Sequence, residues 1–207
     1  MTLSLLGPTE KQIYILENET LLKIQHGSWE LYSTLANEDL KVEYIKEAIY
    51  IQSPASLTHE EIFRILLVKI SNYLENKKLG KVLGSRFPIK LQDNHRAEPD
   101  ILFISNNAIK QGKLTNTIFE GEPTWILEIV SPSYREHDTI TKRNEYMNLN
   151  VNEYWIIDSE YKTIEVINFK DNKEVRREVI TNGSLKPRIE GFDEFRVDIQ
   201  DLFKTHQ

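Results

Sequence analysis

Cysteine is absent from this chain of 207 residues. Its absence excludes disulfide bonds, thiolate nucleophiles and cysteine-ligated zinc, and it fits a protein of the reducing cytoplasm. Glycine is scarce, at 8 residues, and the chain has no glycine-rich phosphate loop, no Gly-x-Ser-x-Gly and no His-Glu-x-x-His. The sequence therefore argues against a nucleotide-cradling loop, a serine-hydrolase elbow and a zinc-protease helix.

Long apolar runs are also missing. No stretch reaches the roughly 18 apolar residues that a transmembrane helix requires. Residues 1–8 lack a basic segment and hold too few apolar residues to resemble a signal peptide. We therefore expect a cytoplasmic protein without a membrane partner.

The charge balance is acidic, with a formal net charge of −6. A chain of this charge does not coat nucleic acid electrostatically, but it leaves room for a nuclease with a local basic groove. Residues 81–96 are the candidate for such a groove, although a solvated pair of strands is the simpler interpretation. The basic residues of this stretch are Lys81, Arg86, Lys90, His95 and Arg96.

The chain length suits one domain with a sizeable core. We predict an N-terminal extension over residues 1–27 that packs on a single domain over residues 28–207. Helices and strands alternate along this domain, which predicts a mixed α/β fold with a central mixed β-sheet flanked by helices. The predicted strands are 42–45, 48–51, 82–83, 87–91, 101–104, 125–130, 153–157 and 163–169. The shorter predicted helices are 28–38, 106–111, 137–149 and 198–204.

The clearest helix of the sequence starts near Thr58. Thr58 and Glu61 have the spacing of a capping box, in which each side chain caps a backbone N–H at the helix start. Apolar residues then recur at helical spacing from Ile62 to Leu74. We expect Gly80 to end this helix, since glycine commonly follows the last helical turn.

Two carboxylates stand out because they lie at or in apolar strands. Asp100 opens the run Ile101–Ile104, and Glu128 interrupts the run 125–130. A carboxylate in a buried strand is costly unless it is paired or binds a metal. Two such groups on strands close in the chain could meet across a sheet and share one divalent cation. This arrangement is typical of metal-dependent phosphodiester hydrolysis.

Mg²⁺ suits this pattern because it prefers a few hard oxygen ligands and several waters. We expect the ligands to be Asp100, Glu128 and the main-chain carbonyl of Ile129, with Mn²⁺ as a substitute ion. Lys142 is the candidate cation near the scissile phosphate. Asp138 lies four residues before it on the predicted helix, where the two side chains could pair, and Tyr146 follows one turn later.

Several segments, taken in this order along the chain, resemble the domain-of-unknown-function family 820, a family of endonucleases common in cyanobacteria. The resemblance covers roughly residues 43–169. The segments are Glu43–Ile45, residues 53–56 with His59, Glu98–Asp100, Leu127–Ser133, Asp138-x-x-x-Lys142, Tyr146 and Glu153–Asp158.

The resemblance implies a restriction-endonuclease-like PD-(D/E)XK fold, DNA as substrate, Mg²⁺ held by Asp100 and Glu128, and assistance by a lysine. Val130 stands where the general pattern has that lysine, so the resemblance offers Lys142 from the following helix instead. Glu43 is a further candidate acid, contributed by the N-terminal region as in related folds. By analogy with these folds, two copies could pair as a homodimer to cut both strands.

Simpler interpretations exist for each of these residues. Asp100 could cap a loop, Glu128 could face solvent on an edge strand, and Asp138 with Lys142 could form an exposed ion pair. His59, in the first turn of a helix, is more simply a surface or capping residue than a ligand. As an alternative to an endonuclease, the chain could be a non-catalytic module on a decayed nuclease fold that binds nucleic acid or protein. Binding of a divalent metal distinguishes the two functions.

Overall fold

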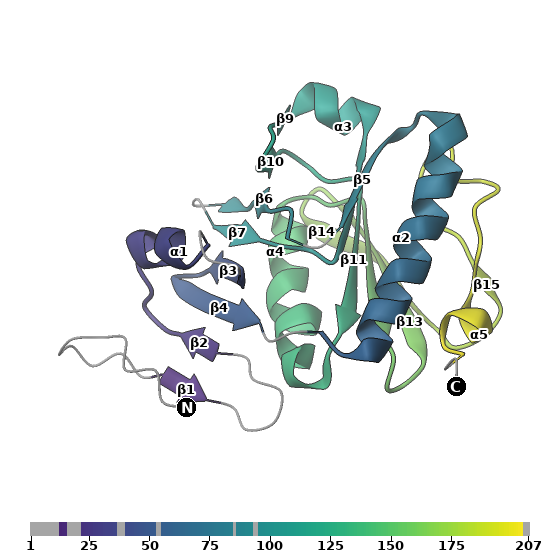
Figure 1. Ribbon diagram of the computed structural model, residues 1–207. Coiled ribbons are helices and arrows are strands. Elements are labelled where there is room, and N and C mark those ends of the chain that lie inside the picture. Colours follow the sequence, from purple (N-terminus) through teal and green to yellow (C-terminus); the bar gives the residue numbers. More distant parts are fainter. Residues whose placement is uncertain are drawn as a thin grey trace.

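The computed structural model describes residues 13–15, 22–36, 40–52, 55–84, 86–92 and 95–204. Its centre is a six-stranded sheet with the order β14-β13-β12-β11-β8-β5 (Figure 1). β11 and β12 are parallel, and the other neighbours are antiparallel. The strands are β5 (Gly80–Gly84), β8 (Ile101–Ser105), β11 (Trp125–Val130), β12 (Glu153–Asp158), β13 (Thr163–Lys170) and β14 (Lys173–Ile180).

The middle of this sheet is buried on both faces. Every residue of β11 and β12 is buried, as expected for the parallel part of a sheet covered on two sides. Helix α2 (Leu57–Lys77) covers one face, packing Ile62, Leu66, Ile70 and Leu74 against it. Helix α4 (Arg143–Asn148) lies on the other face, where Tyr146 joins the second half of the core. The predicted mixed sheet flanked by helices is confirmed.

A second sheet, of eight short strands, has the order β1-β2-β4-β3-β7-β6-β10-β9. Its longest pair is the hairpin of β3 and β4, which confirms the predicted strands there. Lys46 and Glu47 form its turn, both with positive φ angles of 52° and 57°. The strands are β1 (Ile13–Ile15), β2 (Leu22–Ile24), β3 (Lys41–Ile45), β4 (Ala48–Gln52), β6 (Ile89–Lys90), β7 (Arg96–Ala97), β9 (Lys113–Leu114) and β10 (Phe119–Glu120).

Alternation along β3 directs its residues to two different layers. Val42 packs in a small cluster with Tyr32 of α1 (Trp29–Ala36), on the outer side. Ile45 belongs to the core between the second sheet and the central sheet. Because side chains alternate along a strand, Glu43 shares the inner side with Ile45. This places a carboxylate of the second sheet against the central one.

The remaining elements are short. The described part of the chain holds no helix that is long and apolar enough to cross a membrane. Of the helix predicted over 28–38, residues 37 and 38 lie outside the described residues. The elements are α3 (Asn106–Gln111), a 3₁₀ turn η2 (Pro132–Tyr134), a π-helical segment η3 (His137–Lys142), β15 (Ser184–Leu185), β16 (Val197–Asp198) and α5 (Ile199–Leu202).

Both predicted ends of the long helix were wrong. Ser56, not Thr58, is the N-cap, and its side chain accepts a hydrogen bond from the backbone N–H of His59. The helix ends at Lys77. Lys78 then adopts the left-handed conformation that a glycine commonly takes just after a helix. Gly80 instead begins β5, where a Cβ would lie 2.2 Å from the carbonyl oxygen of Ile104. The glycine is required by close strand contact and not by the helix end.

The helix predicted over 137–149 was also incomplete. Its first six residues, His137–Lys142, are π-helical, and only Arg143–Asn148 is an α-helix. A π-helical segment has i→i+5 hydrogen bonds in place of i→i+4, and such segments are frequent at functional sites. Nothing in an apolar pattern of period 3.6 signals this change.

Replacing Ser56 tests the revised start of α2. Ser56→Ala removes the side-chain cap and should lower the free energy of unfolding by about 1 kcal/mol. Thr58→Ala, two residues away and also exposed, is the matched control and should change stability by less than about 0.5 kcal/mol. Urea denaturation followed by circular dichroism measures both. Equal losses in the two variants would contradict the assignment of Ser56 as the cap.

Candidate active site

Asp100 and Glu128 lie on one face of the central sheet. Leu102 and Ile104 of β8 pack in the same core cluster as Ile126 and Val130 of β11. Alternation therefore places Asp100, two residues before Leu102, and Glu128, between Ile126 and Val130, on this face too. Both are buried, with exposed fractions of 3% and 1%. The two carboxylates therefore share one buried face of the central sheet.

Hydrogen bonds to the backbone hold the two side chains beside each other. The β8–β11 pairing stops at Ile101 and Leu127. Beyond it, the Ile129 N–H donates to Asp100 Oδ2 at 2.9 Å, and the Asp100 N–H donates to Glu128 Oε2 at 3.3 Å. The carboxylates thus replace the next bonds of the ladder. Because the N–H and C=O of a strand residue point to the same side, the Ile129 carbonyl also points toward Asp100.

Lys142 reaches the space beside Glu128, as expected. Its Nζ lies 3.1 Å from Glu128 Oε1, 3.0 Å from Glu43 Oε1 and 3.4 Å from Asp138 Oδ1. The side chain is 1% exposed, so the interpretation of Asp138 and Lys142 as an exposed ion pair was wrong. Tyr146 completes the contacts of Glu128 by donating to Oε1 at 2.6 Å.

Glu43 joins the same cluster from the second sheet. Its Oε1 accepts from the Glu98 N–H at 2.8 Å, besides the contact with Lys142. Its Oε2 lies 2.7 Å from His137 Nε2 and accepts from Gln52 Nε2 at 3.2 Å. The cluster therefore joins side chains of β3, β4, β11 and the helix that follows β11.

The π-helical segment explains how His137 and Lys142 both contact Glu43. In an α-helix the fifth residue onward lies about 140° around the axis, because each residue turns about 100°. In η3 the i→i+5 pattern brings it back over the first. His137 stacks on Tyr50, with ring centroids 4.0 Å apart, which fixes its ring against β4.

Two further basic side chains contact Asp100. Lys41 Nζ lies 2.7 Å from Oδ1, and His59 Nε2 lies 3.1 Å from Oδ2. The interpretation of His59 as a mere surface or capping residue was wrong. Lys41 and His137 were missed as well. One signal was available for Lys41: it lies two residues before Glu43 in a strand, so the two side chains share a face.

Burial and neighbouring charges shift the pKa values of the carboxyl groups in opposite directions. Burial alone would raise the pKa of Glu43, but Lys142 and His137 outweigh it and hold this pKa well below its usual range. The pKa of Asp100 is likewise lowered, since Lys41 and His59 outweigh its burial. Burial, with repulsion from Asp100, raises the pKa of Glu128 to about 8 although Lys142 opposes it.

The four carboxylates nearest to Lys142 and Lys41 leave an excess of negative charge. Glu43, Asp100, Glu128 and Asp138 carry four negative charges when ionised, against two ammonium groups. Within the described residues, no three His, Asp or Glu side chains gather around one point as a ready-made metal site. Mg²⁺ does not require such a set, because one or two carboxylates with waters suffice. The donors therefore fit a divalent ion.

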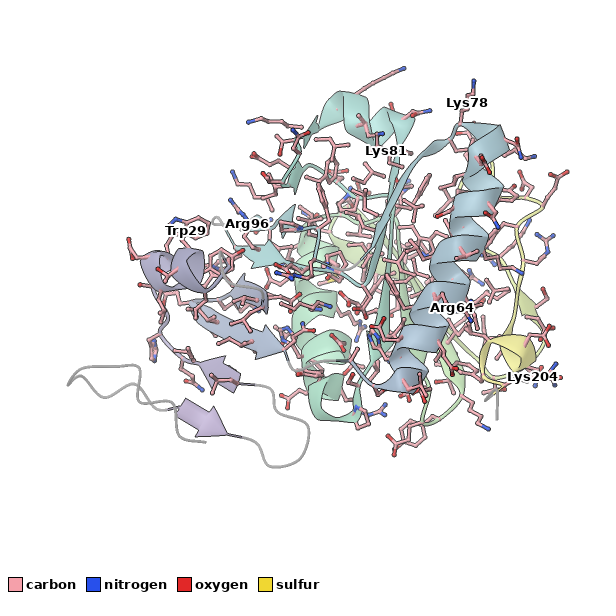
Figure 2. All side chains as sticks on the ribbon, in the orientation of Figure 1. Trp29, Arg64, Lys78, Lys81, Arg96 and Lys204 are labelled. Atoms are coloured by element: carbon pink, nitrogen blue, oxygen red, sulfur yellow. The ribbon has the colours of Figure 1, made fainter. Side chains whose placement is uncertain are left out.

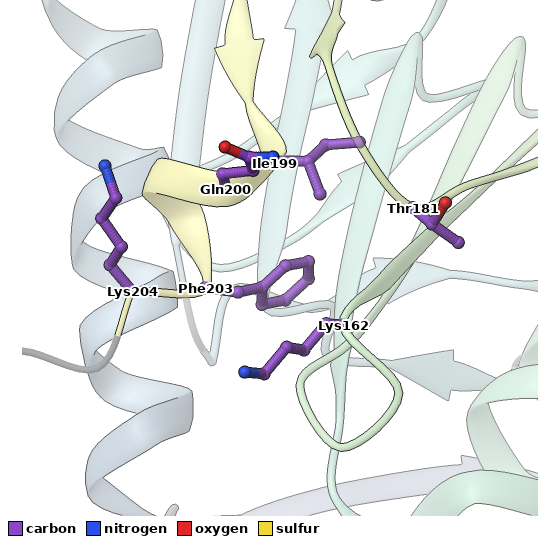
Figure 3. A pocket seen from close by; sticks show the side chains of 6 residues that line it. All are labelled: Lys162, Thr181, Ile199, Gln200, Phe203 and Lys204. Atoms are coloured by element: carbon purple, nitrogen blue, oxygen red, sulfur yellow. The ribbon is translucent and has the colours of Figure 1, made fainter.

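The pocket shown in Figure 3 and the basic stretch 81–96 are separate from this cluster. The pocket in Figure 3 is lined by two lysines and no carboxylate, so it does not suit a divalent metal. In the basic stretch, Lys90 pairs with Glu120 at 3.1 Å, and Arg96 lies over the ring of Trp29 at 5.2 Å (Figure 2).

Comparison with known proteins identifies the family. The Uma2 family model, described as "Putative restriction endonuclease", matches residues 29–200. The chain belongs to this family. Membership supports a nuclease role and agrees with the resemblance that the motifs indicate. A search of curated protein sequences found no match.

A solved structure of the same kind shows the fold. It is the crystal structure of "a putative nuclease belonging to DUF820" from Anabaena variabilis, with a TM-score of 0.65 and 23% sequence identity. The match covers 78% of this chain and 89% of that one. The restriction-endonuclease-like fold of this family member is therefore confirmed.

Removing the central ammonium should destabilise the protein strongly. Lys142→Met leaves buried carboxylates unpaired and should cost about 3–5 kcal/mol of unfolding free energy at neutral pH. Arg143→Met is the matched control, because its partly exposed pair with Glu174 should contribute less than about 1 kcal/mol. Urea denaturation of both variants measures the difference.

The pH dependence of the Lys142→Met deficit has a definite sign. Without the ammonium the folded-state pKa values of Glu43 and Glu128 rise, and a raised pKa favours folding only where the group is protonated. The loss of unfolding free energy should therefore be largest near pH 8. It should shrink as the pH falls toward 4.5, the ordinary pKa of glutamate. A deficit that does not change between pH 8 and pH 4.5 would contradict the cluster as described.

Proposed function

We propose that this protein is a Mg²⁺-dependent endonuclease that hydrolyses phosphodiester bonds of DNA. The observation that carries the proposal is the buried arrangement of Asp100 and Glu128, with Lys142 against Glu128. Burial of several charged groups is costly even when they are paired, and here it is combined with family membership that supports a nuclease role.

Asp100, Glu128 and the Ile129 carbonyl are the proposed ligands of Mg²⁺, with Mn²⁺ as a substitute. With all four carboxylates ionised, the cluster has an excess of two negative charges, which one divalent ion would neutralise, and a bound cation would itself favour that ionisation. When bound there, Mg²⁺ supplies a water that is nucleophilic near neutral pH and stabilises the charge that develops on the phosphate.

Lys142 and Glu43 have distinct proposed roles. The Lys142 ammonium orients Glu128 and stabilises negative charge that develops next to it, a contribution that pre-organised charges make in a site shielded from water. Glu43 positions Lys142 through the 3.0 Å contact and holds His137 at 2.7 Å. Because Glu43 accepts four hydrogen bonds or ion pairs, it remains ionised and keeps the ammonium in place.

A plasmid-nicking assay in Mg²⁺ or Mn²⁺ tests this function. Asp100→Asn removes a ligand charge at constant shape and should lower cleavage at least about 10²-fold, since a metal ion contributes several kcal/mol to the transition state. It should also lose Mn²⁺ binding in calorimetry. Asp201→Asn, an exposed aspartate paired with Lys204 on the surface, is the matched control and should cleave like the native chain.

The outcomes separate the proposed functions. Undiminished nicking by Asp100→Asn would contradict the assigned metal site. A native chain that binds DNA but neither binds Mn²⁺ nor cuts would indicate the binding module instead. Conversion of supercoiled plasmid directly to linear DNA would support a homodimer, because one site per copy cuts one strand at a time.

A further inference from the structure

Within the residues that the structure describes, the charged cluster is most exposed to solvent at Lys41 and His59. Lys41 and His59 are 16% and 13% exposed, whereas the other charged side chains around Lys142 and Asp100 are at most 7% exposed. Both of these side chains end on the carboxylate of Asp100, one on each oxygen. Of the described charged side chains, Lys41 and His59 are therefore the ones that a large anionic ligand would meet first.

The two oxygens of Asp100 differ in how firmly they are engaged. Oδ2 accepts from the Ile129 backbone N–H, which is fixed in the central sheet, and it also faces His59. Within the described residues, Oδ1 has Lys41 as its hydrogen-bond partner, at 2.7 Å. A lysine has four rotatable bonds and leaves such a position more easily than a backbone group does. Oδ1 is thus the oxygen that can be given up to a metal ion.

An ammonium and a divalent cation compete for that oxygen. The two positive groups repel each other, so binding of the ion at Asp100 favours release of Lys41. The interior of the cluster offers the released ammonium no place, because its carboxylates are already engaged with Lys142, His137 and backbone donors. The free direction is toward solvent, from which a nucleic acid would approach.

We propose that Lys41 binds a phosphate of the substrate backbone, and that it becomes free to do so when a divalent ion displaces it from Asp100. The proposal rests on the metal site of the proposed function. It assigns separate work to two lysines: Lys142, 1% exposed among three carboxylates, holds the cluster together, and Lys41 contacts the nucleic acid. Metal binding and DNA binding are then coupled, and each strengthens the other.

Metal affinity gives the first test. Lys41→Met removes the competing ammonium, so calorimetry with Mn²⁺ alone should give a dissociation constant about ten-fold lower than for the native chain, a difference of about 1.4 kcal/mol. Lys90→Met, which removes a lysine paired with Glu120 outside the cluster, is the matched control and should leave Mn²⁺ affinity unchanged. Unchanged or weaker Mn²⁺ binding by Lys41→Met would overturn the proposal.

DNA affinity gives the second test. Binding to duplex DNA is measured with Ca²⁺ as the divalent ion, and a gel verifies that the DNA stays uncut. Lys41→Met should bind about ten-fold more weakly, and its slope of log affinity against log salt should be smaller by about one, as for the loss of one phosphate contact. In EDTA the native chain and Lys41→Met should bind DNA equally, because Lys41 then stays on Asp100. A difference of the same size in EDTA and in Ca²⁺ would overturn the displacement.

Two controls keep the result interpretable. Lys41→Gln retains a donor toward Asp100 and serves as the second variant, with thermal melting to verify that both are folded. If the native chain binds Mn²⁺ and shows these Lys41 effects but does not nick DNA, the proposed cleavage fails and this inference stands. If neither the native chain nor Lys41→Met binds Mn²⁺, the inference is overturned.

Discussion

The contact between Lys142 and Glu43 joins the two halves of this structure. Glu43 comes from the hairpin of the second sheet, and Lys142 comes from the helix that follows the central strand β11. Both are fully buried, so neither charge can turn to water if the other moves away. A buried charge that loses its partner is strongly destabilising. The pair therefore fixes how closely, and in which register, the second sheet sits on the central one.

The apolar core around this pair makes the constraint stricter. Ile45 and Tyr50 of the hairpin pack with Ile126 and Tyr146, so the ion pair lies within a close-packed layer between the sheets. Close-packed interiors transmit displacements instead of absorbing them. A shift of the hairpin large enough to open the cluster would have to disrupt that layer. Stability and site geometry thus depend on the same contacts in this protein.

Much of the fold and the centre of the site could be predicted from the sequence. The strands around Asp100 and Glu128 are short, apolar and bounded by proline or glycine, and a carboxylate in such a strand is conspicuous. Alternation along a strand could place Lys41 on the face of Glu43, but its contact with Asp100, like that of His59, could not be predicted, because the two residues lie 59 and 41 positions away in the chain. Local patterns carry no distance information of this kind. The cap at Ser56 was missed for a different reason: two hydroxyl residues lie close together, and the pattern favoured the wrong one.

The π-helical segment His137–Lys142 has a consequence for how this constellation can change over generations. Each hydrogen bond of a π-helical segment spans one residue more than a hydrogen bond of an α-helix. Removal of a single codon between His137 and Lys142 would place the two residues at i and i+4 of an ordinary α-helix, about 40° apart, so both side chains would stay on the face toward Glu43. The segment can therefore absorb one inserted residue, or lose it again, while the histidine and the amine keep the same carboxylate as their partner.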